Sequence, residues 1–268
     1  MQRTETTQLQ QMLNKVPEVT VYFWIIKVLA TTVGETAADL LATRLGLGLT
    51  LTSWVMSAVF VVALVYQVRA KRYLPPIYWL TVVLISVVGT LISDNLVDGM
   101  GISLVTTSIA FSLILAVVFA LWYRSEKTLS IHTIFTTRRE LYYWAAILFT
   151  FALGTSAGDL LAETMEFGYG PAALVFAAMI GLVAFVYYVV KIDAILAFWI
   201  AYILTRPLGA SIGDFLAKPV IADGMGWGTV PTSLIFLGLI LALVVYLTVT
   251  KSDTIASSGK TSQAASEA

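Results

Sequence analysis

Long apolar runs separated by short polar stretches fill most of the chain. A helix needs roughly 20 mainly apolar residues to cross the hydrocarbon core of a bilayer. Eight runs approach that length, and turn-forming or charged residues separate them. The pattern therefore predicts eight transmembrane helices. They cover residues 17–43, 50–68, 75–97, 102–123, 140–164, 171–190, 192–217 and 229–249.

The odd-numbered runs share one repeated pattern. In each of them a Trp precedes a Gly by ten residues, and that Gly precedes an Asp by five. A short Gly-containing turn and a returning apolar run follow each copy, which predicts four two-helix hairpins. The four copies are Trp24-Gly34-Asp39, Trp79-Gly89-Asp94, Trp144-Gly154-Asp159 and Trp199-Gly209-Asp214.

The repeat also predicts the architecture. Every hairpin begins on the same side of the membrane, so the four hairpins run parallel around an axis along the membrane normal. The expected fold is an all-α integral membrane protein with eight transmembrane helices. The first helix of each hairpin carries the polar residues and should face the axis. The Leu-, Val- and Phe-rich second helices should face lipid, where charge is costly.

The same repeat divides the chain into five parts. Two membrane halves, of two hairpins each, flank a cytoplasmic linker. The linker contains the extra residues by which the second and third copies are farther apart than the other neighbouring copies. A Ser-, Ala- and Lys-rich tail is expected to be disordered, and the N-terminal segment is expected to be amphipathic. The parts are residues 1–16, 17–123, 124–139, 140–249 and 250–268.

Charge placement predicts the orientation. Most Lys and Arg outside the spans gather in the loops on the side of the two termini, whereas the opposite loops contain only Arg44 and Lys218. By the positive-inside rule, both termini should be cytoplasmic. In the N-terminal segment, Leu9, Met12, Leu13 and Val16 follow helical spacing, which predicts a short helix on the inner membrane surface.

Composition agrees with this class and excludes others. Hydrophobic residues make up 59% of the 268 residues, and the mean hydropathy is +0.88. Net charge is zero, so no basic excess indicates nucleic acid. The chain has no Cys and one His, His132, which has no second ligand at metal spacing. No HExxH or P-loop pattern occurs, so we expect no enzyme.

Aligning the four copies turns each helix position into a ring of four side chains around the axis. The ring of acids is followed, one turn deeper each time, by three mixed rings. In order, the rings are Asp39, Asp94, Asp159 and Asp214; Glu35, Thr90, Thr155 and Ala210; Thr31, Ser86, Phe151 and Arg206; Lys27, Val82, Ile147 and Tyr202.

The acids suggest cation chemistry. A charge inside a span costs roughly 2.5–3.5 kcal/mol, so these carboxylates should face water, one another or bound cations. Oxygen ligands without Cys suit hard cations such as Mn²⁺, Mg²⁺ or Ca²⁺. The expected metal ligands are Glu35, Asp39, Asp94, Asp159 and Asp214. The expected path or gate residues are Lys27, Thr31, Ser86, Thr90, Thr155 and Arg206. No resident cofactor is expected.

Arg206 breaks its ring, where the other copies have Thr, Ser or Phe. A buried guanidinium favours bidentate carboxylate partners, so Arg206 should pair with Glu35 or with an Asp across the axis. Pro207 should kink the helix at this point. The Trp ring near the inner helix ends predicts an aromatic belt at the membrane interface.

The stretch "KVPEVTVYFWIIKVLATTVGETAADLLATRLGLG" resembles a family of bacterial multi-pass proteins known only as uncharacterised membrane-anchored proteins. The resemblance extends over the repeated Gly-x4-Asp hairpins, about residues 15–250. It implies a protein of the bacterial inner membrane and brings no substrate or mechanism.

We therefore expect a secondary transporter of a cation, such as Mn²⁺ exported in exchange for protons. Expected partners are an inorganic cation, protons and membrane lipid, with a homo-oligomer also allowed and no nucleic acid. One alternative is a passive channel, in which the Asp ring concentrates cations at an outer mouth. Another is a membrane scaffold or sensor subunit that transports nothing and uses the hairpins only for packing.

Overall fold

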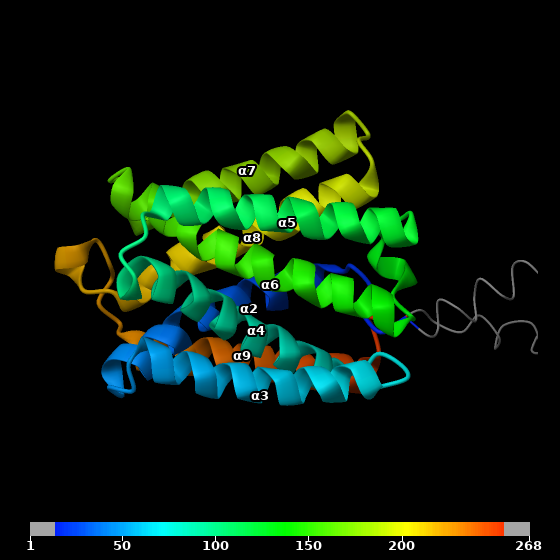
Figure 1. Cartoon of the computed structure of the whole chain (residues 1–268), viewed down its shortest axis with the longest axis horizontal. Coiled ribbons are helices and arrows are strands. Elements are labelled where there is room, and N and C mark those ends of the chain that lie inside the picture. The colour runs from blue at the N-terminus through cyan, green and yellow to red at the C-terminus, as the bar shows by residue number, and fades with distance from the viewer. Residues whose placement is uncertain (1–13, 255–268) are drawn as a thin grey trace, which may run out of the picture.

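The computed structural model describes residues 14–254, and the regular structure in that part is helical throughout. Eight long helices lie side by side, and both described chain ends lie at one end of the bundle (Figure 1). They are α2 (Val21–Asp39), α3 (Leu49–Arg69), α4 (Pro75–Asp94), α5 (Leu104–Glu126), α6 (Thr137–Asp159), α7 (Tyr169–Val189), α8 (Ala194–Ala217) and α9 (Thr229–Thr250). The prediction of eight long helices is confirmed.

Seven of these helices are long and apolar enough to cross a membrane. The exception is α2, whose 19 residues include Lys27, Glu35 and Asp39. We call the end of the bundle that holds residues 14–20 and 251–254 the terminus end. The opposite end, where the first helix of each repeat reaches its Asp, is the aspartate end.

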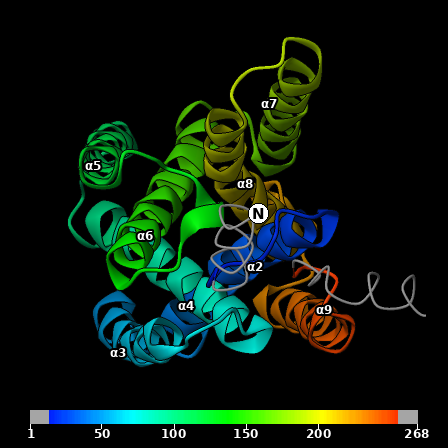
Figure 2. The same ribbon diagram turned by 90° about the vertical axis from the view of Figure 1, so that its right-hand side faces the viewer.

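The four first helices form a closed inner ring. Along the bundle, α2 packs against α4, α4 against α6, α6 against α8, and α8 against α2 again (Figure 2). The outer helices α3, α5, α7 and α9 surround this ring. In the most apolar 18-residue stretch of each helix, 50–61% of the residues are buried in α4, α6 and α8. In the outer helices the share is 11–28%. The prediction that the first helices face the axis is confirmed.

The two helices of a repeat contact each other little, so the predicted packing as hairpins is not confirmed. Each outer helix packs instead on the first helix of the next repeat: α3 on α4, α5 on α6, α7 on α8, and α9 on α2. Hydrogen bonds follow the same rule, since Asn95 Nδ2 donates to Ser53 Oγ and Ser233 Oγ donates to Thr36 Oγ1, both over 2.7 Å. The repeats therefore interlock, and α9 of the fourth repeat packs on α2 of the first.

The repeated Gly marks the contact between neighbouring inner helices. A Cβ on Gly34 would collide with Ser86 of α4, and one on Gly209 would collide with Thr31 of α2. The same holds for the Gly of the other two repeats, which face Phe151 and Arg206. Each Gly thus admits a residue from the next copy, and small residues permit such close approach of membrane helices.

A π-helical turn directly follows the Asp in three of the four repeats. These turns are η1 (Leu40–Arg44), η2 (Asn95–Gly99) and η4 (Leu160–Thr164). In the fourth repeat, α8 continues through Pro207 to Ala217, and a 3-10 turn, η5 (Val220–Ala222), follows. The linker contains a similar short turn, η3 (Ile131–Thr133). Single π-turns are frequent at functional sites.

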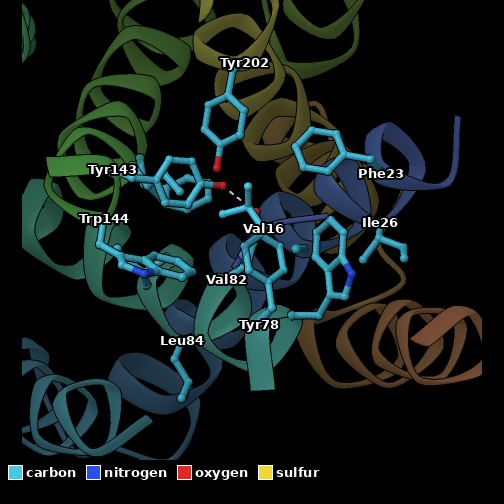
Figure 3. Packing of buried hydrophobic residues seen from close by; sticks show 14 of the residues in the cluster. Val16, Phe23, Ile26, Tyr78, Val82, Leu84, Tyr143, Trp144 and Tyr202 are labelled. Carbon is cyan, nitrogen blue, oxygen red and sulfur yellow. Dashed lines mark hydrogen bonds between the residues drawn. The ribbon is translucent and has the colours of Figure 1, made fainter. Parts of the chain in front are cut away.

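The N-terminal segment enters the bundle at the terminus end. Val16 is not helical, is only 3% exposed and joins the cluster that includes Tyr78, Tyr143 and Tyr202 (Figure 3). A surface helix that includes Val16 is therefore wrong, whereas Leu9, Met12 and Leu13 lie outside the described residues.

The start of the expected tail is also packed. Tyr73 Oη donates to Asp253 Oδ2 over 2.6 Å, and Glu18 N donates to Asp253 O over 3.0 Å. The first residues of the expected disordered tail, 250–254, are thus ordered, whereas residues 255–268 lie outside the described part.

Candidate functional site

Arg206 lies where all four repeats meet. Its side chain is fully buried and reaches from α8 into the ring that lies one turn nearer the aspartate end. Nη2 donates to Glu35 Oε2 over 3.0 Å, to Thr155 Oγ1 over 2.7 Å and to Thr90 Oγ1. Nη1 donates to the carbonyl oxygen of Thr31 over 3.1 Å. Each of the other three repeats thus supplies at least one acceptor.

This geometry confirms the predicted pairing of Arg206 with Glu35. The Glu35 side chain is 11% exposed and that of Arg206 is fully enclosed, so water competes little for the pair. The fourth repeat contributes Ala210 to the same ring, a side chain with no polar group. The guanidinium from one turn below supplies the polar contact there instead. An ion pair this buried is costly to break, because either charge alone would be uncompensated.

The four Asp differ in their surroundings. Asp214 is nearly buried and lies 3.7 Å from Lys218 Nζ. Asp39 accepts a 2.6 Å hydrogen bond from Thr43 Oγ1. Asp94 and Asp159 are partly exposed. The four copies are therefore not equivalent.

The five predicted metal ligands gather loosely at the aspartate end. Asp39, Asp94 and Asp159 are the last residues of α2, α4 and α6, and Glu35 lies one turn before Asp39. Among residues 14–254, however, no three His, Cys, Asp or Glu side chains are grouped closely enough to hold a metal ion. The ligand set stays a prediction, and binding through several of these carboxylates would require them to approach one another.

Lys27 lies deeper on the axis and has no acidic partner in the described part of the chain. It is fully buried, and its Nζ is 4.1 Å from the ring centroids of both Phe151 and Tyr202. Nζ makes no hydrogen bond within residues 14–254, and neither does Ser86 Oγ. Aromatic faces attract a cation, so these two rings stabilise the ammonium group of Lys27.

Aromatic side chains close the axis below Lys27. The hydroxyls of Tyr78 and Tyr143 lie 2.5 Å apart, and Val16 belongs to the same buried cluster (Figure 3). Trp79, Trp144 and Trp199 are at most 4% exposed and lie in the same buried cluster as these tyrosines. The prediction of an aromatic belt at the membrane interface is therefore wrong for these three Trp.

Sequence reasoning missed a buried polar cluster that fixes the N-terminal segment. Lys15 Nζ donates to Glu140 Oε2 over 2.9 Å and to Val68 O over 2.8 Å. Gln67 Nε2 donates to Glu140 Oε1 over 3.1 Å and to Lys15 O over 3.2 Å. Glu140 is fully buried. The signal was available, because the aligned copies have Thr20, Pro75 and Ile195 at this position.

Comparison with known families recovers the same repeat. The family model described as Repeat of Unknown Function (DUF347) matches residues 22–73, 77–128, 142–193 and 197–253. Each match holds the first helix and the outer helix of one repeat. No curated protein and no solved structure matches the chain. Because the four matches together cover most of the chain, the protein belongs to the Repeat of Unknown Function (DUF347) family.

Proposed function

We propose that the protein is a secondary transporter of a cation in which Glu35 binds either Arg206 or the transported ion. The observation that carries this proposal is the buried Arg206–Glu35 pair at the junction of all four repeats. The specific form that we propose is export of a divalent metal such as Mn²⁺ in exchange for protons, without enzymatic activity.

The proposal places the protein in a bacterial inner membrane with the terminus end in the cytoplasm. Seven long apolar helices and apolar outer faces support insertion, and the Lys and Arg bias supports the orientation. The native chain has no Cys, so single cysteines report topology directly. Those at 46–48 and 168–170 should react from outside, and those at 128–134 from inside. Reaction of both sets from one side would contradict the proposal.

In this mechanism the arginine acts as a tethered substitute for the cation. With the site empty, Arg206 neutralises Glu35 and holds the four repeats together at one level. An arriving cation takes the carboxylate, and the hydroxyls of Thr90 and Thr155 then exchange a guanidinium for a metal as their partner. The Asp ring receives the ion on the outer side. Protons that return to these carboxylates release it.

The closed terminus end favours a transporter over a passive channel. Val16 and the tyrosines fill the axis on that side, so an ion passes only if this end rearranges. A channel would need a continuous wet path in some state, and a scaffold would need no charged pair at its centre. Flux separates the scaffold from the other two, and saturation with proton dependence separates the transporter from the channel.

Proteoliposomes loaded with a metal-sensitive dye test the proposal. Wild-type protein should give saturable Mn²⁺ flux that a pH gradient drives, and Glu35→Gln should abolish the coupled flux. Arg206→Ala should raise uncoupled leak per folded molecule, because nothing then occupies Glu35 in the empty state. Gly181→Ala, at an exposed site with open space around it, is the matched control. Absence of flux for every metal tried, or unchanged flux in both variants, would contradict the proposal.

The seal at the terminus end has its own test. Ile147→Cys places a thiol on the axis at a fully buried position and should resist reagents added from the cytoplasmic side. Adding Lys15→Ala should expose it, because the segment then loses its contact with Glu140. Ser252→Cys, which is exposed beyond the end of α9, is the positive control for labelling. Continued protection in the double variant would show that residues 14–18 do not seal the axis.

A further inference from the structure

A cleft of about 580 Å³ opens at the terminus end between α7, α8 and the start of α2. Its volume lies within the range of sites that hold small ligands. The walls are mainly apolar, and the rings of Trp24 and Phe198, with centroids 5.6 Å apart, lie on one side. The other wall residues that matter here are Ile180, Val183, Ala184 and Ala201.

The polar rim of the cleft comes from segments outside the repeat. Glu18 belongs to the N-terminal segment, and Ser130 and His132 belong to the linker. His132 Nδ1 and Glu18 Oε2 are 3.4 Å apart, and both side chains remain partly exposed. The rim thus offers one acid and one base, and the Glu18 hydrogen bond raises the pKa of His132 although partial burial opposes this.

The apolar walls continue onto the outer surface of α7. Ala184 and Tyr188 line the cleft and are exposed on α7, so an apolar chain can enter from that side. A ligand that fits must therefore combine an apolar tail with a head that satisfies both Glu18 and His132. An anionic head would offer the Glu18 carboxylate no partner of opposite charge. A purely cationic head would leave the imidazole without its partner.

We propose that this cleft binds one phospholipid with a zwitterionic, amine-bearing headgroup, such as phosphatidylethanolamine. An acyl chain lies between α7 and α8, the ammonium group pairs with Glu18, and the phosphate accepts from His132. Glu18 and His132 exchange their mutual contact for the two halves of the headgroup, so no charge is left uncompensated. The rings of Trp24 and Tyr187 also favour an ammonium group. This proposal rests on the membrane insertion proposed above, but not on transport.

The site has a structural consequence for the seal. Glu18 follows Lys15 and Val16 by a few residues, and its backbone N–H is bonded to Asp253 O. A lipid held by Glu18 would therefore fix the segment that closes the terminus end.

Native mass spectrometry of the full-length, delipidated protein in detergent tests the proposal. Phosphatidylethanolamine and phosphatidylglycerol with identical acyl chains are titrated separately. We expect one phosphatidylethanolamine to bind at least about tenfold more tightly than phosphatidylglycerol. Phosphatidylglycerol lacks the charged hydrogen bond from the ammonium group to Glu18, and one such bond accounts for a difference of this size. Glu18→Gln should remove that preference. Ala201→Phe, which fills the cleft, should remove the single tight site.

The control is Ala116→Phe, which adds the same bulk at an exposed position of α5 and should bind as wild type. If Ala201→Phe does not elute as a monodisperse folded protein, Ala184→Phe fills the same cleft from α7. Equal binding of the two lipids, or tight binding that survives a folded cleft-filling variant, would overturn the proposal. Because the readout is binding alone, a failure of metal flux leaves this result unaffected.

Discussion

The fourth repeat differs from the first three at the level where function is proposed. In the first three, the Asp leads into a π-helical turn, and the ring position below Glu35 holds Thr31, Ser86 or Phe151. In the fourth, that position holds Arg206 followed by Pro207, and no π-turn occurs in the described chain after Asp214.

The comparison separates two kinds of residue. The Gly and the Asp occur in all four copies, and the Gly contacts are the same around the ring. Arg206, Glu35, Lys27 and Glu140 each occur in one copy only, and they make or seek the charged contacts. The repeated Gly therefore builds the ring, and residues that depart from the repeat supply the buried charges at its centre.

The largest expected effect comes from breaking the ion pair that Arg206 of the fourth repeat makes with Glu35. Glu35→Ala leaves the Arg206 guanidinium buried without a carboxylate, which should lower the free energy of unfolding by about 3–5 kcal/mol. Adding Arg206→Met should recover much of that loss, because the buried charge is then gone. Unfolding in detergent–SDS mixtures measures both. A double variant no more stable than Glu35→Ala would show that the charge is not the cause.

Disrupting the close helix contact at the repeated Gly should have a somewhat smaller effect. Gly154→Ala places a Cβ against the stem of Arg206 and against Pro207, and overpacking of this kind costs about 1–3 kcal/mol. Gly181→Ala is the matched control, because its new Cβ meets open space and Ala favours the helix. The same SDS titration compares them. Equal stability of the two variants would contradict the role of the repeated Gly.

The interlocking of repeats predicts a weaker effect at the closure of the ring. Ser233→Ala removes the 2.7 Å hydrogen bond from α9 to Thr36 of α2. Interhelical hydrogen bonds in membrane proteins contribute about 0.6 kcal/mol on average, so a loss of that size is expected. Ser112→Ala, on the exposed face of α5, should change nothing. A loss in both variants alike would indicate a general effect of the hydroxyl.

The smallest effect concerns the pair outside the repeat. Because the pKa of His132 is raised by Glu18, the pair stabilises the fold fully below the unfolded value of about 6.5 and loses this contribution as pH rises through the folded value. The His132 side chain is 48% exposed, so only a few tenths of a kcal/mol are expected.

Thermal melts of the wild type and Glu18→Gln from about pH 6 to about pH 9 check this, since the range spans the histidine titration. The difference between the two proteins should shrink as pH rises. A difference that stays constant would exclude the pair as its source.

Much of the site could be predicted from the sequence because the repeat supplied an internal alignment. Residues in one register must lie at one height in a ring of parallel helices, which placed Arg206 within reach of Glu35. Lys27 was placed on the axis correctly, but its contacts with the faces of Phe151 and Tyr202 depend on how those rings pack. Glu140 was missed because its partner, Lys15, lies outside the repeat.

The sequence by itself determined the eight helices, the four copies and the helices that face the axis, since apolar length and polar periodicity are properties of each segment alone. Only the tertiary structure decided that α3 packs on α4 rather than on α2, and that Val16 enters the core. Those outcomes depend on which surfaces fit one another in three dimensions. A Gly permits a close approach to any neighbour, and the neighbour is chosen by the whole closed ring.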